Sequence, residues 1–252
     1  MTAKPANDAA PKTLLFGVGL GPGDPDYMTV RARDIIVSAD RLVHFCKRGR
    51  RGNARVTADA VTPPDAAREI ELAFPVTIEV PVEDEGYSGP ISAFYDESAA
   101  LLAAEMEAGR SVAVLCDGDP FFYGSFMHLW RRLAHRFPTE IVPGVTGMAG
   151  AWTRAQAPIT WGDDVMTVLP GTLPEAELAR RLADTDAAVI MKLGRNLPKV
   201  RRALQAAGLL DRAIYVERAT MAEQVVARLA DKPDDEAPYF SMVLVPGEGR
   251  RL

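Results

Sequence analysis

The feature that most constrains the fold of this chain is an alternation of short apolar runs with helical patterns over its whole length. Short apolar runs bounded by turn residues are typical of strands, and strands that alternate with helices predict a parallel sheet. The expected strands are Leu14–Val18, Arg41–Phe45, Thr77–Val80, Ser111–Cys116, Glu140–Val142, Ala187–Met191, Ala213–Glu217 and Tyr239–Val245. The sequence therefore predicts an α/β protein whose strands are largely parallel.

The expected helices repeat apolar residues at helical spacing and begin or end at residues typical of helix caps. One helix follows Thr29 and places Ala32, Ile35, Ile36 and Ala39 on one face. The others are Ile91–Ala108 before Gly109, Leu197–Ala207 before Gly208, and Met221–Leu229. Because the alternation runs through both halves of the 252 residues, we expect two α/β domains, 12–142 and 143–252, with a ligand cleft where they meet.

Composition excludes several classes of protein. The net charge of −5 argues against a general nucleic-acid binder, which is normally basic. Cys46 and Cys116 are isolated and the three histidines are scattered, so we expect no disulfide framework and no metal. Residues 1–12 lack the apolar core of a signal peptide. No apolar run is close to the length of about 20 residues that a membrane span needs. We therefore expect a cytoplasmic protein with no membrane partner.

The first expected strand leads into a glycine-rich loop, which first suggests a nucleotide site. Its glycines stand at every second position, at Gly17, Gly19, Gly21 and Gly23. The dinucleotide spacing G-x-G-x-x-G fails in both frames, because Pro22 and Asp24 stand where the last glycine must fall. Pro22 and Pro25 also keep a helix N-terminus away from the loop. A phosphate-binding loop is therefore not expected.

Two further loops resemble the first in position. The run "SVAVLC" leads into "DGDPFFYGS", and "EIV" leads into "PGVTGMAG". Open α/β sheets bind ligands at the carboxyl ends of their strands, so the three loops predict one shared pocket. Asp117 and Asp119 offer hydrogen-bond acceptors, and Phe121, Phe122 and Tyr123 offer faces for a flat ring. The alternative is that all three are ordinary tight turns.

Four motifs in this order resemble the tetrapyrrole (corrin and porphyrin) methyltransferases. They are "GVGLGPGDPDYMTVRA", "CDGDPFFYGS", "VPGVTGMAG" and "VERATMAEQ", and the similarity extends over residues 13–247. The resemblance implies two α/β domains, a homodimer, and S-adenosylmethionine bound in the trough between the domains. Within the family, "HFCKRGRRGNAR" and "FPVTIEVP" resemble the precorrin-2 C-20 methyltransferases of vitamin B12 synthesis, which implies a tetrapyrrole substrate, precorrin-2, and the product precorrin-3A.

Transferred motif by motif, the resemblance also implies a cofactor site. Its expected residues are Pro22, Asp117, Gly118, Asp119, Thr146, Gly147 and Ala219, together with a residue near the end of the strand before "GRNL", where Met191 and Lys192 are both open. Methyl transfer to carbon is an in-line displacement that depends on positioning and exclusion of water, so no protein nucleophile is required. The general base is unknown. Asp24 is a candidate proton acceptor, although aspartate is common in turns for structural reasons.

The run "KRGRRGNAR" holds five cations, Lys47, Arg48, Arg50, Arg51 and Arg55. Arginine binds carboxylates bidentately, so the run is a candidate site for the acidic side chains of the macrocycle. A solvated surface loop and a nucleic-acid patch are alternatives, and the run lacks the aromatic residues that single-strand binding favours. His44 beside it is interpreted as a strand residue, with a catalytic base as the alternative.

Other functions also stay open. The diphthine synthase type shares the fold and methylates a protein side chain, and it has less use for clustered cations. A non-catalytic cofactor-binding module and a cobalt-containing or other tetrapyrrole substrate are further alternatives.

Overall fold

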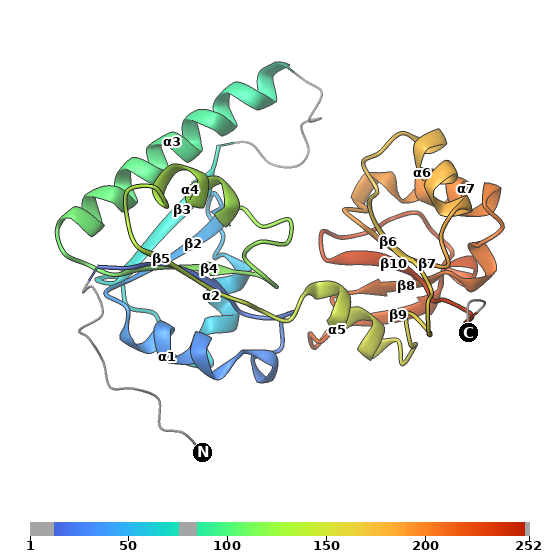
Figure 1. The fold of residues 1–252 in the computed structure, drawn as a ribbon, viewed down its shortest axis with the longest axis horizontal. Coiled ribbons are helices and arrows are strands. Elements are labelled where there is room, and N and C mark those ends of the chain that lie inside the picture. The colour runs from blue at the N-terminus through green and yellow to red at the C-terminus, as the bar shows by residue number, and fades with distance from the viewer. Residues whose placement is uncertain (1–12, 76–84, 250–252) are drawn as a thin grey trace. The chain divides into compact units, whose positions relative to one another are not determined.

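The computed structural model describes residues 13–75 and 85–249 of the chain (Figure 1). The chain divides into two compact units, Met1–Val145 and Thr146–Leu252. Each unit contains one five-stranded sheet with helices on both faces. This architecture confirms the prediction of two α/β domains.

The first unit holds a parallel sheet in the strand order β3-β2-β4-β1-β5. Its strands are β1 (Leu15–Gly19), β2 (Arg41–Lys47), β3 (Glu69–Phe74), β4 (Val112–Cys116) and β5 (Thr139–Val142). Its helices are α1 (Val30–Ser38), α2 (Asn53–Ala58), α3 (Glu85–Glu107) and α4 (Phe126–Leu133). The expected strand Thr77–Val80 lies outside the described residues.

Burial explains the position of β4 at the centre of this sheet. All five of its residues are buried, as an apolar run that is covered on both faces requires. Val112 and Val114 face a core cluster built on α3 and α4, and Ala113 and Leu115 face a second cluster built on α1 and α2. Figure 1 shows the two pairs of helices on opposite faces of the sheet.

The second unit holds a mixed sheet in the strand order β6-β7-β10-β8-β9. Its strands are β6 (Met166–Pro170), β7 (Ala187–Met191), β8 (Ile214–Glu217), β9 (Val225–Arg228) and β10 (Ser241–Val245). Its helices are α5 (Gly147–Arg154), α6 (Glu175–Ala183) and α7 (Leu197–Ala206). Only β6 and β7 pair in parallel, because β10 runs antiparallel to both β7 and β8 and β9 runs antiparallel to β8. The expectation of largely parallel strands is therefore wrong for this sheet.

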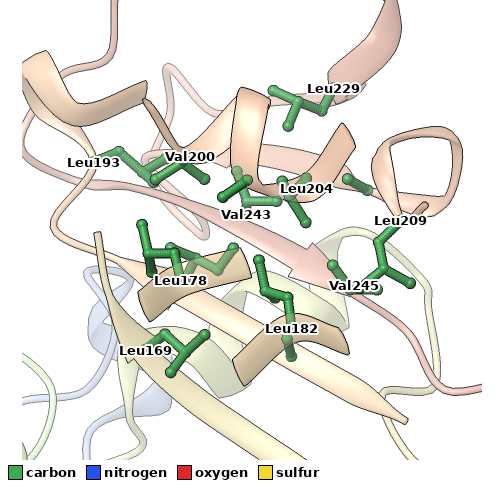
Figure 2. Packing of buried hydrophobic residues seen from close by; sticks show 14 of the residues in the cluster. Leu169, Leu178, Leu182, Leu193, Val200, Leu204, Leu209, Leu229, Val243 and Val245 are labelled. Atoms are coloured by element: carbon green, nitrogen blue, oxygen red, sulfur yellow. The ribbon is translucent and has the colours of Figure 1, made fainter. Parts of the chain in front are cut away.

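One face of the second sheet carries the larger apolar cluster. Leu178 and Leu182 of α6 pack with Val200 and Leu204 of α7 over Val243 of the central strand (Figure 2). The other face packs against α5. The expected helix Met221–Leu229 is wrong, since the chain there forms β9, where β-branched Val225 and Val226 extend a hairpin with β8.

A glycine in β1 allows α4 to lie close to the sheet. A Cβ atom placed on Gly17 lies 2.4 Å from Cε1 of Phe126, whose side chain is fully buried. Gly17 is therefore required by packing between strand and helix, and the opening glycine of the motif has no need of a ligand.

We expect Gly17→Ala to destabilise the protein by about 1–3 kcal/mol, because the added methyl overlaps the Phe126 ring. In a Phe126→Leu background the same change should cost clearly less, since the clashing ring is gone. Urea unfolding of the four proteins in this double-mutant cycle measures the difference. An equal cost in both backgrounds would contradict the packing argument.

His44 is a buried polar residue within β2. Its side chain is fully buried, and neither ring nitrogen has a hydrogen-bond partner among the described residues. Nε2 lies 3.9 Å from Oε2 of Glu69 and 4.0 Å from Oε1 of Glu71, too far for a hydrogen bond. Burial lowers the pKa of His44, with nearby Arg55 and Arg51 acting in the same direction and the two glutamates opposing it.

This depressed pKa predicts a dependence of stability on pH. The unfolded chain protonates His44 near pH 6.5, while the folded protein keeps the ring neutral to lower pH. The contribution to stability is therefore complete above about pH 6.5 and is lost as the pH falls, by at most about 1.4 kcal/mol per pH unit.

We expect His44→Leu to flatten the fall in unfolding free energy between about pH 7.5 and about pH 5.5. The pKa of His128 is also lowered by burial and by nearby arginines, so its contribution is present in both proteins and cancels in the comparison. Denaturant unfolding at three pH values measures both slopes. Identical slopes would show that His44 does not titrate differently in the folded and unfolded states.

Candidate active site

The loops that follow β1, β4 and β5 meet at the carboxyl ends of these strands, as the sequence predicts. Gly21 and Gly118 form an antiparallel bridge, in which each backbone N–H donates to the carbonyl of the other at 3.3 and 2.8 Å. The Leu20 N–H donates to the carbonyl of Cys116 at 3.0 Å. The first and second loops are therefore joined through their backbones.

The third loop joins them through glycines that leave no room for a side chain. A Cβ atom on Gly144 would lie 2.0 Å from the carbonyl oxygen of Gly118, and one on Gly19 would lie 2.5 Å from the backbone nitrogen of Gly144. Gly118 itself has a φ of 67°, the left-handed region that glycine occupies at no steric cost. Sequence analysis left Gly144 out of the site, although a glycine directly after a strand was the available signal.

The side chain of Asp119 connects the second and third loops by hydrogen bonds. Its Oδ2 accepts from the Gly144 N–H at 3.1 Å, and its Oδ1 accepts from the Phe121 N–H at 2.8 Å. Asp117 differs, since its side chain is exposed. The protein around Asp117 partly desolvates its carboxyl group and raises the pKa to about 6, so the group is ionised at neutral pH.

Two further residues of the first loop were predicted for the site. Pro22 lies half-buried directly after the bridging Gly21. Asp24 caps a short 3-10 helix, Pro25–Tyr27, by accepting from the Asp26 N–H at 3.0 Å. This contact is the structural role that aspartate commonly has in such turns.

The second unit gathers the remaining predicted cofactor residues around α5. Thr146 caps this helix by accepting from the Ala149 N–H at 3.4 Å, and a Cβ atom on Gly147 would lie 3.7 Å from Cε of Met242. Met191 at the end of β7 and Ala219 just after β8 both pack on the apolar cluster that includes Ala151 of α5. Met191 and Ala219 therefore lie at the carboxyl ends of β7 and β8, on the face of the sheet that α5 covers.

Met191 and Lys192 are distinguished by their surroundings. Met191 is half-buried on the α5 side of the sheet, and its carbonyl accepts from the Gly171 N–H at 2.6 Å. Lys192 is exposed and has a φ of 57°. The packing favours Met191 as the side chain directed to the same face as Ala219.

The basic run divides into two groups. Lys47, Arg48 and Arg50 are exposed, and within the described chain their side chains form no hydrogen bond or ion pair. Arg51 forms a bidentate pair with Asp59, at 2.9 and 2.8 Å. Arg55 is fully buried and ion-paired, so its placement favours a structural role over the predicted contact with substrate.

Sequence analysis missed the helix α2 within this run and the acidic partners of its arginines. The available signal was the i, i+4 spacing of Arg55 and Asp59. Among residues 13–75 and 85–249, no group of three or more histidine, cysteine or acidic side chains is placed to hold a metal ion. No helix in the same residues is both long and apolar enough to span a membrane.

Comparison with known proteins places these loops in a family. The family model of the tetrapyrrole (corrin/porphyrin) methylases matches residues 14–232. A precorrin-2 C(20)-methyltransferase from Sinorhizobium sp is 57% identical over 92% of this chain and 95% of that protein. A cobalt-precorrin-2 C(20)-methyltransferase from Salmonella typhimurium is 33% identical over 92% of this chain and 95% of that protein.

Solved structures share the fold. The uroporphyrin-III C-methyltransferase of Thermus thermophilus, solved with S-adenosylhomocysteine, superposes with a TM-score of 0.63 and 21% identity, over 92% of this chain and 96% of that one. With the converging glycine loops, the family match over most of the sequence and the full-length relatives, this chain belongs to the tetrapyrrole (corrin/porphyrin) methylases.

Proposed function

We propose that this protein transfers a methyl group from S-adenosylmethionine to carbon 20 of precorrin-2 and so forms precorrin-3A in cobalamin synthesis. The observation that carries the proposal is the joining of three strand-end loops through the backbones of Gly21, Gly118 and Gly144. A site walled by backbone lets a ligand approach closely. The name of the 57% identical relative supports this choice of substrate.

The residues present fit such a cofactor. In the first unit we assign Pro22, Asp117, Gly118 and Asp119 to it, and in the second Thr146, Gly147, Met191 and Ala219, with Lys192 as the alternative to Met191. Asp117 is exposed and ionised, so it can accept hydrogen bonds from hydroxyl or ammonium groups. When bound, S-adenosylmethionine supplies a methyl group on a positively charged sulfur.

The protein's own contribution to this reaction is positioning. An in-line displacement needs the attacking carbon and the methyl group held in line and kept dry. Asp119 serves this purpose indirectly, because its two carboxylate oxygens hold the second and third loops in place. After methylation the macrocycle must lose a proton. Asp24 is our candidate acceptor, although one of its oxygens already caps a turn.

The acidic side chains of the acceptor require cations. We assign this role to Lys47, Arg48 and Arg50, whose charges are exposed at the carboxyl end of β2, with Arg51 beside them. A cluster of exposed cations suits a substrate with many carboxylates. It favours the tetrapyrrole substrate over the protein side chain that the diphthine synthase type methylates. We also propose that the enzyme is a homodimer and that it is located in the cytoplasm. Light scattering of the purified protein tests whether it is a dimer.

The test of the activity is direct. Purified protein incubated with S-adenosylmethionine and precorrin-2 should yield a product heavier by one methyl group, with the new carbon located by NMR. A parallel reaction with cobalt-precorrin-2 addresses the alternative suggested by the name of the 33% identical relative. Methylation of the cobalt compound alone would correct the substrate, and methylation of neither would refute the proposal.

For the cofactor site, we expect Gly118→Ala to weaken S-adenosylhomocysteine binding about tenfold or more. Left-handed backbone costs a residue with a side chain about 1–2 kcal/mol, which the loop can relieve only by moving. Isothermal titration calorimetry measures the affinity.

Gly208→Ala is the matched control. Gly208 follows α7, has a φ of 68° against 67° for Gly118, and has open space around it. The two variants therefore carry the same backbone strain, and only the change at Gly118 should alter affinity. Unchanged binding by folded Gly118→Ala, or an equal loss in the control, would remove this loop from the site.

For the acceptor site, we expect replacement of Lys47, Arg48 and Arg50 by glutamine to raise KM for the tetrapyrrole roughly three- to a hundredfold. Each exposed ion pair contributes about 0.2–1 kcal/mol, and three such contributions add. Affinity for S-adenosylhomocysteine should change little. The salt dependence of KM between about 0.05 and about 0.2 M should also become weaker, because the screened charges are gone.

The control removes the same charge elsewhere, by changing Arg33 of α1, Arg131 of α4 and Arg228 of β9 to glutamine. All three are exposed. If both triple variants raise KM equally, net charge and not this loop governs acceptor binding. If the loop variant leaves KM unchanged, the run is a solvated surface loop.

A further inference from the structure

A buried guanidinium lies beneath the exposed cations. Arg55 of α2 is fully buried, and its Nε donates to Oε1 of Glu69 at 2.8 Å. Its Nη1 donates to Oδ1 of Asp59 at 2.9 Å, and its Nη2 donates to the carbonyl of Thr62 at 3.3 Å. One side chain therefore connects α2 to strand β3 and to the turn that follows α2.

The two carboxylates extend this connection. Asp59 also accepts both bonds from Arg51, which stands in the loop before α2, and this pairing holds the pKa of Asp59 below its usual range. Glu69 also accepts from the Asp65 N–H at 3.0 Å. Although burial opposes its ionisation, the bond from Arg55 helps to hold the pKa of Glu69 below its usual range. The cluster is thus charged throughout.

We define residues 47–52 as the cationic loop. At its far end, a Cβ atom on Gly52 would lie 2.2 Å from the carbonyl oxygen of Phe45 and 2.8 Å from Nδ1 of His44, so the loop folds back onto β2. At its near end, the Arg50 N–H donates to the carbonyl of Lys47 at 2.9 Å. The loop is therefore a short turn that continues directly from β2 and packs back onto it at Gly52, and it carries the exposed Lys47, Arg48 and Arg50.

Burying an arginine is a costly way to gain stability. Replacing a buried ion pair by apolar residues of similar size is often neutral or stabilising, so the charges are not explained by stability alone. What a planar, multiply bonded guanidinium provides is a single geometry for the elements that it joins. Here those elements are α2 and, through Asp59 and Arg51, the cationic loop.

We propose that Arg55 is a positioning residue for the acceptor: its ion pairs with Glu69 and Asp59 hold the cationic loop in the one arrangement in which Lys47, Arg48 and Arg50 meet the carboxylates of the substrate. Pre-organised cations do not have to be ordered when the substrate binds, which preserves affinity. This inference rests on the proposed function for its substrate, but the rigidity of the loop is measurable without it.

The main test variant is the double change Arg55→Met, Glu69→Met. It removes both members of the buried pair and leaves no uncompensated charge, so the protein should stay folded. The matched control is Arg41→Met, Glu105→Met. Arg41 starts the same strand β2 at its opposite end, pairs with Glu105 at 2.6 Å and donates to the Ala67 carbonyl at 2.6 Å.

Limited trypsin digestion measures how readily the cationic loop opens, since trypsin cleaves after lysine and arginine. With fragments mapped by mass spectrometry, cleavage after Lys47, Arg48 and Arg50 should be faster in the Arg55/Glu69 variant by about tenfold or more, a change of about 1.4 kcal/mol in local opening. Cleavage elsewhere should be unchanged. In the Arg41/Glu105 control, these loop sites should be cut at the parent's rate.

The kinetic reading separates positioning from charge. The Arg55/Glu69 variant should raise KM for precorrin-2 with little change in kcat or in S-adenosylhomocysteine affinity. Its KM should keep the parent's salt dependence, because all three exposed cations remain. The single variant Arg55→Lys should raise KM less than the double variant does, since a lysine keeps the charge but lacks the guanidinium fork.

The outcomes are distinguishable. If the parent does not methylate precorrin-2, the proposed function fails, and the digestion still tests the loop. If the parent is active and the folded Arg55/Glu69 variant matches it in loop cleavage and KM, the positioning role is refuted. If that variant does not fold, Asp59→Asn is the second test, because it breaks the partly exposed pair between Asp59 and Arg51. It must then give the same faster loop cleavage and the same rise in KM for the inference to stand.

Discussion

The structure of the first unit depends on close backbone contact among three glycines at the carboxyl ends of its strands. A carbonyl oxygen 2.0 Å from the place of a Cβ atom on Gly144 leaves no tolerance for a side chain, and the Gly21–Gly118 bridge joins the neighbouring loop by two hydrogen bonds. Strand order brings this about, because β1 lies between β4 and β5. Three loops far apart in sequence are therefore joined through their backbones into one surface.

Charge plays a different role in each part of the basic run. Exposed cations at 47, 48 and 50 are available to an acidic molecule, whereas Arg51 and Arg55 are occupied by Asp59 and Glu69. Basic side chains are thus exposed in one part of the run and are held in internal ion pairs a few residues later. Composition cannot separate these roles, since the difference lies in which acidic residues the fold brings near.

Much of the first unit could be predicted from sequence because its signals are local. An apolar run such as Val112–Cys116 is buried on both faces, and glycine and proline after a strand mark the loops that meet at the strand ends. The cap at Thr29 was equally visible, and its Oγ1 accepts from the Ala32 N–H at 3.1 Å.

The rest depended on contacts that a single sequence does not display. Val225 and Val226 lie within a segment whose spacing also suits a helix, and only pairing with β8 makes it a strand. The direction of β10 was hidden as well, since a buried strand has the same apolar pattern whether its neighbours are parallel or antiparallel. Arg55 was grouped with the exposed cations because its burial follows from α2, which the dense charge concealed.

The place of β10 in the second sheet has a consequence for synthesis on the ribosome. The strands of the first sheet end at Val142, so that sheet can assemble while the remainder of the chain is still being made. The second sheet has its last strand, Ser241–Val245, at its centre between β7 and β8. Until those residues leave the exit tunnel, β6 and β7 cannot join β8 and β9. The second sheet is therefore completed only after β10 has been made, whereas the first sheet needs no strand beyond β5.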